Sequence, residues 1–459
     1  MNTWIDELRQ ELGEALHTDT PTLQAHASDK WHAAHLPDAV LLATDTAQVS
    51  AAMKIASAHG IPVTPRGAGV GYVGGCVPVR GGLVISTAPM QRIVELNPAD
   101  GVAVVEAGVL TADLQEACAE LGWFYPPDPA SRKESSIGGN IATNAGGPRC
   151  LKYGVTRNYV LGLEVVLADG RILRCGGRTH KNKQGFDLTG LFCGSEGMLG
   201  IITQATLRII PAPPARAALH ASFPRFALAA QAVQNILQGG HLPCAIEITD
   251  AYTLAAARAY LQNDVLPANA QGHIIIETDG QPDAVATEIE SISRILQETG
   301  ATAICPARTE EEVEQIWQLR REFSYSLKAT GLTKLNEDIV IPRSQLVQLV
   351  DFCESMQHET GIPVACFGHS GDGNIHTNIM VPKDAQGRDI RQPADELVNR
   401  LFRWVTEHGG SITGEHGIGL AKAPWFPTAI GNTAMDVHRT LKLALDPLRI
   451  LNPGKMNLD

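Results

Sequence analysis

The stretch Pro65-Arg-Gly-Ala-Gly-Val-Gly-Tyr-Val-Gly-Gly75 decides the fold, because it follows a predicted strand and contains the pattern Gly-x-Gly-x-x-Gly. In a Rossmann fold this pattern opens a helix whose N-terminus binds a pyrophosphate. Here the chain continues as Gly75-Cys-Val-Pro-Val-Arg-Gly-Gly82, which cannot begin a helix. The Rossmann interpretation therefore fails. A loop without Cβ atoms can still bind phosphate through successive backbone N–H groups, and a tight turn between strands is the alternative for this loop taken alone.

Two more segments of the same character follow in the first half of the chain. Ser136-Ile-Gly-Gly-Asn-Ile-Ala-Thr-Asn-Ala-Gly-Gly147 combines small residues with amide and hydroxyl side chains, and Gly194-Ser-Glu-Gly-Met-Leu-Gly200 leads into a predicted strand. Such segments allow a flat ring to lie against the backbone and offer hydrogen-bond donors to its heteroatoms. Together the three segments suit a long, flat, phosphate-bearing cofactor better than three unrelated turns.

Composition narrows the class of protein. The chain has 459 residues, of which 44% are hydrophobic and 19% charged, as in ordinary globular proteins of two or three domains. It has no apolar run long enough to span a membrane and no signal peptide at its start, so we expect a cytoplasmic enzyme, peripheral to a membrane only through a partner. The net charge of −12 argues against nucleic-acid binding but permits a small anionic substrate.

The nine cysteines follow no metal or disulfide pattern. No Cys-x-x-Cys occurs, and the nearest two, Cys353 and Cys366, lie thirteen positions apart. We therefore expect buried, reduced thiols rather than a disulfide framework, a zinc ribbon or an iron–sulfur cluster. If electrons leave this protein through an iron–sulfur centre, that centre lies on another chain.

Hydrophobic periodicity predicts an α+β organisation. The first 35 residues have helical apolar spacing at Trp4, Leu8, Leu12 and Leu16, and Pro211-Ala-Pro-Pro214 reads as a linker. Strands are predicted at 39–43, 62–65, 83–86, 102–106, 162–167, 171–175, 200–210, 243–249, 273–278, 334–341, 362–368 and 374–381. Helices are predicted at 46–59, 225–238, 283–298, 309–329, 343–359, 393–408 and 433–445.

A metal site is predicted around His369-Ser-Gly-Asp-Gly-Asn-Ile-His376, which lies between two strand-like runs. If the hairpin loop is 371–374, the two histidines face each other across the strands with Cβ atoms about 5 Å apart. Gly414-Glu-His-Gly417 supplies a carboxylate. Two histidines and one glutamate form a three-ligand set of the catalytic zinc type, with manganese and iron left open. Two hydrogen-bonded surface histidines are the alternative.

A carboxylate-binding site is predicted on the helix at 309–329. Arg320 and Ser324 lie four residues apart and share a helix face, and Lys334 opens the next strand. An arginine can bind a carboxylate through two parallel hydrogen bonds, to which a hydroxyl adds a third. A solvated charged face is the alternative.

These motifs, with Tyr153-Gly-Val-Thr-Arg157 and Gly162-Leu-Glu-Val-Val-Leu-Ala-Asp-Gly170, resemble the FAD-linked oxidoreductases of the vanillyl-alcohol oxidase type. Within that family the chain is similar to the D-2-hydroxyacid dehydrogenase branch, which includes D-lactate and D-2-hydroxyglutarate dehydrogenases and glycolate oxidase flavin subunits. The resemblance implies an FAD-binding unit of two subdomains at 1–215, a substrate or cap domain with the metal site at 216–419, and a C-terminal segment at 420–459 that returns to the FAD-binding unit.

The resemblance also implies roles for individual residues. The metal ligands would be His369, His376 and Glu415, with His416 as the general base; Arg320, Ser324, Lys334 and Asn378 would bind the substrate. Ser324 stands where the resemblance leads one to expect threonine, and the spacing to Lys334 is one residue shorter than the resemblance implies. The FAD contacts would come from Pro65, Arg66, Gly67, Ala68, Gly69, Val70, Gly71, Ser136, Gly139, Asn140, Thr143, Asn144, Gly146, Gly147, Glu196, Gly200, Ile201 and Asn452.

The implied reaction is oxidation of a small D-2-hydroxy acid, of the D-lactate or glycolate type, to the 2-oxo acid. A divalent metal would bind the substrate hydroxyl, His416 would remove its proton, and the hydride would pass to flavin N5. The electron acceptor is left open among an iron–sulfur subunit, a quinone and an electron-transfer protein. Whether the protein forms a homodimer is also left open. Two other interpretations remain, a metallohydrolase that uses His369, His376 and Glu415, and a non-catalytic flavin subunit of a larger complex.

Overall fold

The computed structural model describes residues 3–262, 267, 269–307, 309–384, 387, 389 and 391–458, and only the backbone of 391–393. The chain divides into two compact units. The first contains residues 1–147, 154–212 and 415–459, and the second contains 148–153 and 213–414. The C-terminal segment thus belongs to the first unit.

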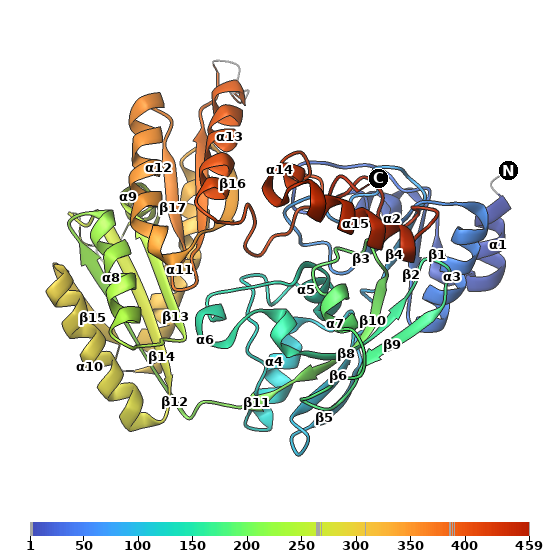
Figure 1. Ribbon diagram of the computed structural model, residues 1–459, viewed down its shortest axis with the longest axis horizontal. Helices are drawn as coiled ribbons and strands as arrows, with labels where there is room; N and C mark the ends of the chain where they lie inside the picture. The colour runs from blue at the N-terminus through green and yellow to red at the C-terminus, as the bar shows by residue number, and fades with distance from the viewer. Residues whose placement is uncertain are drawn as a thin grey trace. The chain divides into compact units, whose positions relative to one another are not determined.

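A four-stranded sheet with the order β1-β2-β4-β3 begins the first unit (Figure 1). Its strands β2, β4 and β3 are parallel, and α1 and α3 pack on it through the fully buried Leu8 and Met53. The predicted strands and helix of this region are confirmed to within a residue. The elements are α1 (Thr3–Leu12), β1 (Leu16–His17), α2 (Thr20–Ala25), β2 (Ala39–Leu42), α3 (Thr46–His59), β3 (Val63–Arg66) and β4 (Leu83–Ser86).

The helical spacing of the first residues runs too far in our prediction. Leu16 lies in β1, because the α-helix ends at Leu12 and Gly13 follows with a φ of +56°. The side chain of Leu16 is still buried in the same core as Leu8 and Leu12. The apolar spacing therefore predicts correctly that Leu16 is buried, although Leu16 lies in a strand and not in the helix.

A five-stranded antiparallel sheet, with the order β5-β6-β10-β8-β9, forms the other part of the first unit. The second glycine-rich segment supplies α5, whose N-cap Ser136 accepts from the Gly139 N–H. Strands β5 and β7 and helices α4, α5 and α7 were not predicted. The elements are β5 (Ile93–Asn97), β6 (Val102–Glu106), α4 (Thr111–Glu120), β7 (Trp123–Phe124), α5 (Ile137–Thr143), β8 (Val160–Val166), β9 (Ile172–Gly176), α7 (Leu188–Phe192), β10 (Ile201–Arg208) and β11 (Ile210–Pro211).

The C-terminal segment extends the four-stranded sheet beside β3. After α14 (Phe426–Ile430) and α15 (Asn432–Leu445), the N–H of Val63 donates to Ile450 O at 2.7 Å and the N–H of Asn452 donates back to Val63 O at 2.7 Å. Lys442 is fully buried and donates to Asp446 Oδ2 and to Leu451 O, both at 2.6 Å. This buried ion pair fixes the turn that places Asn452 against the first unit.

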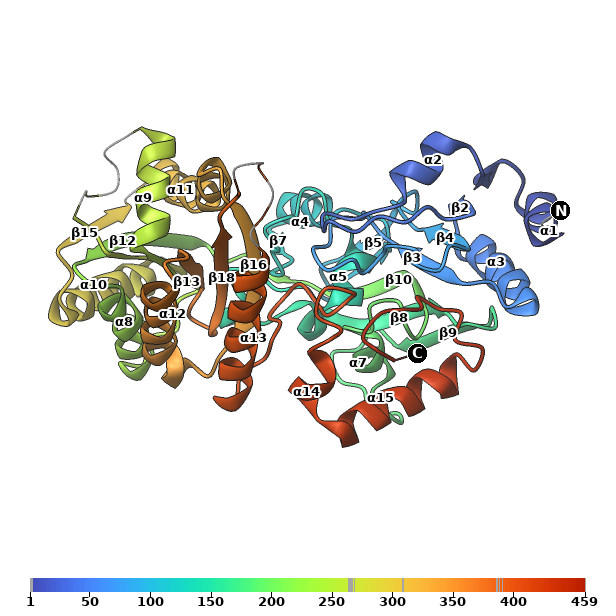
Figure 2. The same cartoon turned by 90° about the horizontal axis from the view of Figure 1, so that it is seen from above.

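The second unit is built on a seven-stranded antiparallel sheet with the order β15-β12-β14-β13-β17-β18-β16. Helices α8, α10 and α12 cover one face of the sheet, and α9 and α11 cover the other (Figure 2). Strands β12 and β15 and helix α9 were not predicted. The elements are β12 (Ala215–Phe223), α8 (Phe226–Gln238), β13 (Ala245–Asp250), α9 (Ala251–Leu261), β14 (Gly272–Gly280), α10 (Pro282–Thr299), β15 (Ala303–Ala307), α11 (Glu310–Ala329), β16 (Thr333–Val340), α12 (Leu346–Thr360), β17 (Val364–His369), β18 (Asn374–Val381) and α13 (Arg391–Glu407).

The short helix α6 (Cys150–Tyr153) belongs to the second unit, although it lies in the sequence of the first. Arg149 Nη2 lies 3.0 Å from Glu277 Oε1 on β14, and Lys152 Nζ lies 2.5 Å from Asp279 Oδ1. The Tyr153 hydroxyl donates to Asp279 Oδ2 at 2.8 Å. The predicted domain boundaries do not include this excursion, because it depends on ion pairs between segments far apart in the sequence.

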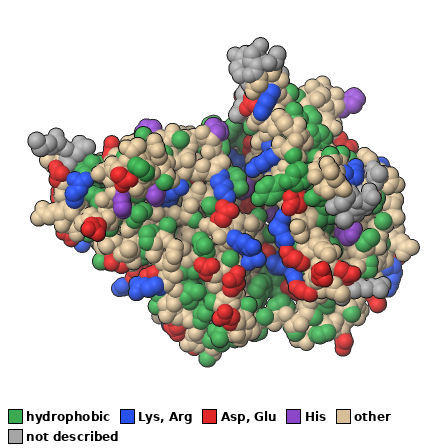
Figure 3. Space-filling view, turned by 180° about the vertical axis from the view of Figure 1, so that it is seen from behind, with side chains coloured by type: hydrophobic (Ala, Val, Ile, Leu, Met, Phe, Trp, Pro, Cys, Tyr) green, Lys and Arg blue, Asp and Glu red, His purple; other side chains and the backbone are tan. Residues whose placement is uncertain are grey.

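Charged side chains of both signs are intermixed on one face of the protein (Figure 3). On the face shown in Figure 3, Asp and Glu side chains lie among the Lys and Arg side chains.

Candidate active site

The glycine loop after β3 offers bare backbone to a ligand. As predicted, no helix follows it within residues 67–82. The backbone N–H groups of residues 67–71 have no hydrogen-bond partner among the described residues. Side chains would close this loop, since a Cβ at Gly67 would lie 2.6 Å from Ser136 Oγ and one at Gly69, where φ is +72°, would overlap the Arg66 guanidinium. Successive backbone N–H groups without partners are what an anion nest requires, so this loop could accept the pyrophosphate of FAD, as predicted for it.

The Arg66 side chain itself points away from such a ligand. Its Nη1 donates to Ser28 O at 2.7 Å and to Cys76 Sγ at 3.2 Å, and its Nη2 donates to Ala25 O at 3.4 Å. Arg66 thus fastens the loop to the segment after α2. The phosphate-binding capacity that we predicted for this loop therefore rests on its backbone.

The polar side chains of the 136–147 segment are also used within the protein. Asn140 Nδ2 donates to Thr111 Oγ1 at 2.6 Å, Thr143 Oγ1 donates to Gly139 O at 3.2 Å, and Asn144 Oδ1 accepts from the Arg157 N–H at 2.9 Å. Gly200 packs against Val165, and Ile201 is 2% exposed. These predicted cofactor residues shape the segment, and their roles toward FAD stay predictions.

Asn452 presents a buried acceptor. It is 1% exposed, and its Nδ2 donates to Gly75 O at 2.8 Å and to Glu196 O at 2.7 Å. Its Oδ1 has no partner among the described residues. A buried amide oxygen of this kind indicates a missing donor, as the predicted position near a flavin requires.

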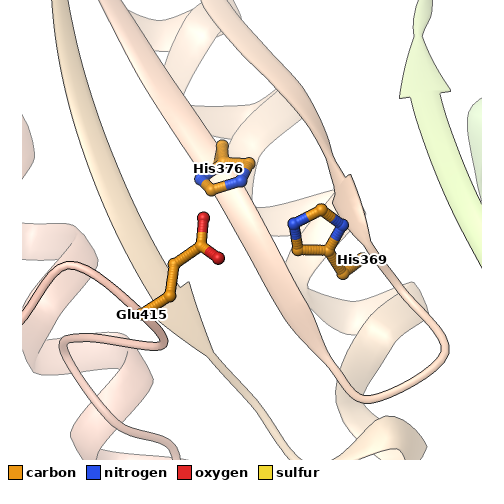
Figure 4. Close-up of side chains that lie close together, drawn as sticks. All are labelled: His369, His376 and Glu415. Atoms are coloured by element: carbon orange, nitrogen blue, oxygen red, sulfur yellow. The ribbon is translucent and has the colours of Figure 1, made fainter. Parts of the chain in front are cut away.

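Two histidines and a glutamate converge beside the hairpin of β17 and β18 (Figure 4). Ligand-type atoms of His369, His376 and Glu415 all lie within 4.8 Å of one another. Glu415 directly follows Gly414, whose N–H donates to the buried Asp338 Oδ2 at 2.9 Å, so the second unit holds the chain up to this carboxylate. The donor set of two imidazoles and one carboxylate fits zinc, manganese or iron.

The predicted pairing of the two histidines across the hairpin is wrong. His376 lies opposite Phe367, and His369 pairs instead with Glu247 on β13. The turn occupies residues 370–373, so the register differs by two residues from the predicted one. Because side chains alternate with a period of two, an even shift leaves both histidines on the same face. Their rings are 5.4 Å apart in a T-shaped arrangement.

Glu247 joins the predicted metal site to the predicted substrate site. This fully buried carboxylate accepts from His369 Nδ1 through Oε1 and from Arg320 Nε through Oε2, each at 2.5 Å. Burial alone would raise the pKa of Glu247, but the charges and hydrogen bonds of Arg320 and His369 hold it below its ordinary value. A carboxylate on one ring nitrogen turns the other toward the space near His376 and Glu415, as in many metal sites.

Cationic groups gather where α11 crosses this sheet face. Arg320 stacks on the Phe367 ring at 4.8 Å, and neither of its terminal nitrogens has a hydrogen-bond partner among the described residues. Lys334 Nζ donates to Ser324 Oγ at 2.8 Å, so the structure brings these two predicted residues together. Burial, followed by the charges of Lys328 and Arg320, lowers the pKa of Lys334 to about 8.

Asn378 lies two residues beyond His376 on the same face of β18. It is fully buried, and its Nδ2 donates to Ala365 O and His376 O, while its Oδ1 has no partner among the described residues. His416, the predicted base, belongs to the first unit, where its ring lies 5.2 Å from that of Tyr72. Its Nε2 is 3.9 Å from Glu415 Oε1.

Sequence reasoning missed Glu247 and Asp338, which hold the predicted residues in place. Asp338 is fully buried and accepts from Asn374 Nδ2 at 2.7 Å and from Thr413 Oγ1 at 3.1 Å. A signal was present for Glu247, since a carboxylate between two isoleucines of the strand Ala245–Asp250 requires a buried partner. Leu151 of α6 was also missed; a Cβ at Gly371 in the turn before β18 would lie 2.5 Å from Leu151 Cδ2.

The glycine loop offers backbone N–H groups to a phosphate-bearing ligand, and the second unit presents Arg320 and two histidines on one sheet face. Residues 37–176 match the family model described as FAD binding domain, and residues 212–456 match that described as FAD linked oxidases, C-terminal domain. The chain belongs to this FAD-linked oxidase family, so it is a flavoprotein oxidoreductase whose cofactor is FAD.

Individual relatives cover nearly the whole chain. A glycolate oxidase subunit GlcD from Bacillus subtilis is 40% identical over 92% of this chain and 89% of its own length. A D-lactate dehydrogenase from Anaerostipes hadrus is 33% identical over 92% and 89%. Escherichia coli K12 has a glycolate oxidase subunit GlcD that is 34% identical over 96% and 88%.

Solved structures confirm the predicted α+β fold of the vanillyl-alcohol oxidase type. p-Cresol methylhydroxylase with substrate bound superposes with a TM-score of 0.82 at 19% identity, covering 100% of this chain and 97% of its own. The 4-ethylphenol oxidase from Gulosibacter chungangensis gives 0.79 at 19% identity, covering 99% and 96%. Within the described part of the chain, no helix combines the length and apolar character needed to cross a bilayer.

Proposed function

We propose that this flavoprotein oxidises a small D-2-hydroxy acid, of the glycolate or D-lactate type, to the corresponding 2-oxo acid. The observation that carries the proposal is the group of side chains on one face of the second unit's sheet, where Glu247 joins Arg320 to His369. Such a group offers cationic donors for a carboxylate beside ligands for a metal, and a 2-hydroxy acid has its carboxylate and its hydroxyl on adjacent carbons. The names of the relatives from B. subtilis and A. hadrus support the same substrate class.

Substrate orientation is assigned to four side chains. The two terminal nitrogens of Arg320 would bind the carboxylate in a bidentate manner, because Glu247 already occupies Nε. Lys334 would add a charge, with Ser324 holding its ammonium group. The Oδ1 of Asn378 would accept a hydrogen bond from a substrate group, since it is buried and has no partner among the described residues.

Removal of the proton from the substrate hydroxyl is assigned to His416. Imidazole is a suitable base near neutral pH. His369, His376 and Glu415 would hold a divalent metal, of which zinc is the proposed species and manganese and iron the alternatives; when bound, the metal supplies a Lewis acid that lowers the hydroxyl pKa. FAD, when bound, supplies the two-electron oxidant.

The electrons are proposed to leave through a separate acceptor. The spacing of the nine cysteines does not suit an iron–sulfur cluster. The word subunit in the names of the GlcD relatives agrees with a partner chain. The acceptor would then be an iron–sulfur subunit, a quinone or an electron-transfer protein.

Anaerobic flavin reduction by the isolated chain tests the proposal. Glycolate, D-lactate, L-lactate, D-2-hydroxyglutarate and p-cresol are compared by the loss of flavin absorbance. We expect bleaching by glycolate or a D-2-hydroxy acid, and slower or no bleaching by L-lactate. Bleaching by p-cresol alone would contradict the substrate class, and no bleaching by any of the five would favour a non-catalytic flavin subunit.

Two substitutions separate the base from the metal ligand. His416→Ala should retain FAD and metal while turnover falls roughly 10²–10⁴-fold, the usual contribution of a positioned base. Glu415→Ala should lose the metal. The opposite pattern, in which His416→Ala empties the metal site and Glu415→Ala leaves it filled, would reverse the two roles.

A further inference from the structure

We infer that Glu196 is a positioning residue that holds the turn at residues 416–419 and thereby orients the imidazole of His416. The inference rests on the proposed role of His416 as base, and it assigns Glu196 a function other than contact with FAD. All the groups concerned lie in the first unit.

The Glu196 carboxylate binds two successive backbone amides of this turn. Its Oε1 accepts from the N–H of Ile418 at 2.7 Å, and its Oε2 accepts from the N–H of Gly419 at 2.8 Å. A carboxylate that accepts one amide on each oxygen fixes both the position and the direction of the peptide planes. Both of its oxygens are therefore already engaged with the protein.

The residue next to His416 packs directly on the same carboxylate. Gly417 has a φ of +88°, and a Cβ there would lie 2.5 Å from Glu196 Oε1. Glycine is thus required at 417 for the turn to approach the carboxylate, both for its backbone conformation and for the lack of space. Glu196 thus contacts the residue that directly follows the proposed base. The other anchor of this segment, in which the N–H groups of Leu420 and Ala421 donate to Val73 O, lies at least four residues from His416.

The backbone of Glu196 is itself fixed by two other segments. It has a φ of +47°, unusual for a residue with a Cβ, and its N–H donates to Ala142 O at 2.8 Å while its O accepts from Asn452 Nδ2 at 2.7 Å. One residue thus connects the 136–147 segment, the C-terminal turn and the His416 turn. A strained backbone held by its surroundings is common where a functional group must be placed accurately.

Keeping this carboxylate in the core is costly, and the cost supports a specific role. Burial raises the pKa of Glu196 to about 7, although the N–H groups of Ile418 and Gly419 and the charges of Lys422 and Lys455 act in the opposite direction. A buried ionisable group is tolerated when its hydrogen bonds are made, and these two are. A turn that needed only closure could use neutral backbone carbonyls instead.

A double-mutant cycle of Glu196→Gln and His416→Asn tests the inference. Glutamine keeps the shape but has one acceptor oxygen, so one of the two amides loses its partner. We expect Glu196→Gln to keep FAD and metal, to lower kcat about tenfold and to leave KM within about twofold, because the base is displaced while substrate groups are not. In the His416→Asn background the same substitution should change kcat by less than about twofold.

Glu106→Gln is the matched control and should leave kcat unchanged, because Glu106 is a buried carboxylate of the same unit that pairs with Arg92 and not with residues 416–419. If Glu196→Gln does not yield FAD-loaded protein, Glu196→Asp replaces it in the same cycle. Full kcat in the Glu196 variant, loss of FAD from both Glu196 variants, or factors that multiply in the double variant would each overturn the inference. Full turnover of His416→Asn would instead overturn the assignment of the base, and the inference with it.

Discussion

Residues 67–71 present a ligand with backbone N–H groups alone, whereas the sheet face of the second unit presents side chains that other side chains hold in place. In the loop, glycine matters because it leaves room, as the positions of Gly67 and Gly69 show. On the sheet face, the functional groups are fixed by buried carboxylates, Glu247 for Arg320 and His369 and Asp338 for Asn374. The first site should therefore fail when a substitution fills its space, and the second when a substitution removes a charge.

The substitution His376→Ala should have the largest effect and should distinguish metal binding from FAD binding most clearly. The variant should lose its metal and nearly all turnover, because two ligands cannot replace three, while FAD remains stoichiometric in the other unit. Elemental analysis and flavin absorbance on the same sample measure both. Active wild-type protein without metal would contradict the proposed site.

Glu247→Gln should weaken both sites of the second unit at once. An amide has one acceptor oxygen, so only one of Arg320 and His369 keeps its partner. Loss of an outer partner of a metal-ligating histidine lowers metal affinity about 10–100-fold, and a metal titration would measure it. Glu359→Gln, at an exposed pair with Arg400, is the control and should leave the metal affinity unchanged.

Gly69→Ala should act on the first unit alone. The methyl group would overlap the Arg66 guanidinium in a backbone conformation with positive φ, so the loop must open and FAD occupancy should fall about tenfold. Gly75→Ala is the control in the same loop, because its nearest contact would be 3.9 Å away. FAD occupancy is measured from flavin absorbance. Equal loss of FAD in both variants would show that steric overlap at Gly69 is not the cause of the loss.

Lys334 gives the second unit a pH dependence that the glycine loop lacks. Its pKa is lowered to about 8, so the ammonium charge is present below that pH and is lost above it. The substrate carboxylate stays ionised, and kcat/KM should therefore fall above pH 8, by about tenfold per unit at most. Lys334→Met should have a lower kcat/KM that no longer declines in this range. A wild-type profile that stays flat up to about pH 10 would exclude a charge-based role.

The smallest effect is expected where α6 meets the turn before β18. Gly371→Ala adds a methyl group 2.5 Å from Leu151 Cδ2, and metal affinity should fall a few-fold as the turn shifts. Leu151→Ala in the same chain removes the overlap and should restore the affinity. Failure of the second substitution to rescue the first would show that α6 does not set the position of this turn.

The sequence predicts the loop well and the sheet face less completely, for a physical reason. A nest of glycines is local, so the absence of a following helix could be read from Pro78 and Gly81 directly. The pairing of His369 depends on β13, more than 100 residues earlier, so the hairpin alone predicted the wrong partner. The ligands were nevertheless found, because an even register shift preserves the face. Glu247 gave a signal only through its burial among apolar neighbours.

The excursion of residues 148–153 has a consequence for modularity. A chimera that transfers residues 213–414 to another flavin-binding unit would leave Glu277 and Asp279 without the cations that Arg149 and Lys152 provide. Glu277 is fully buried and would keep the more distant Arg216, whose Nη1 lies 3.6 Å from its Oε2, but a buried carboxylate that loses a cationic partner is strongly destabilised. The unit of exchange must therefore include residues 148–153, and a chimera that transfers residues 213–414 alone would contain an incomplete module.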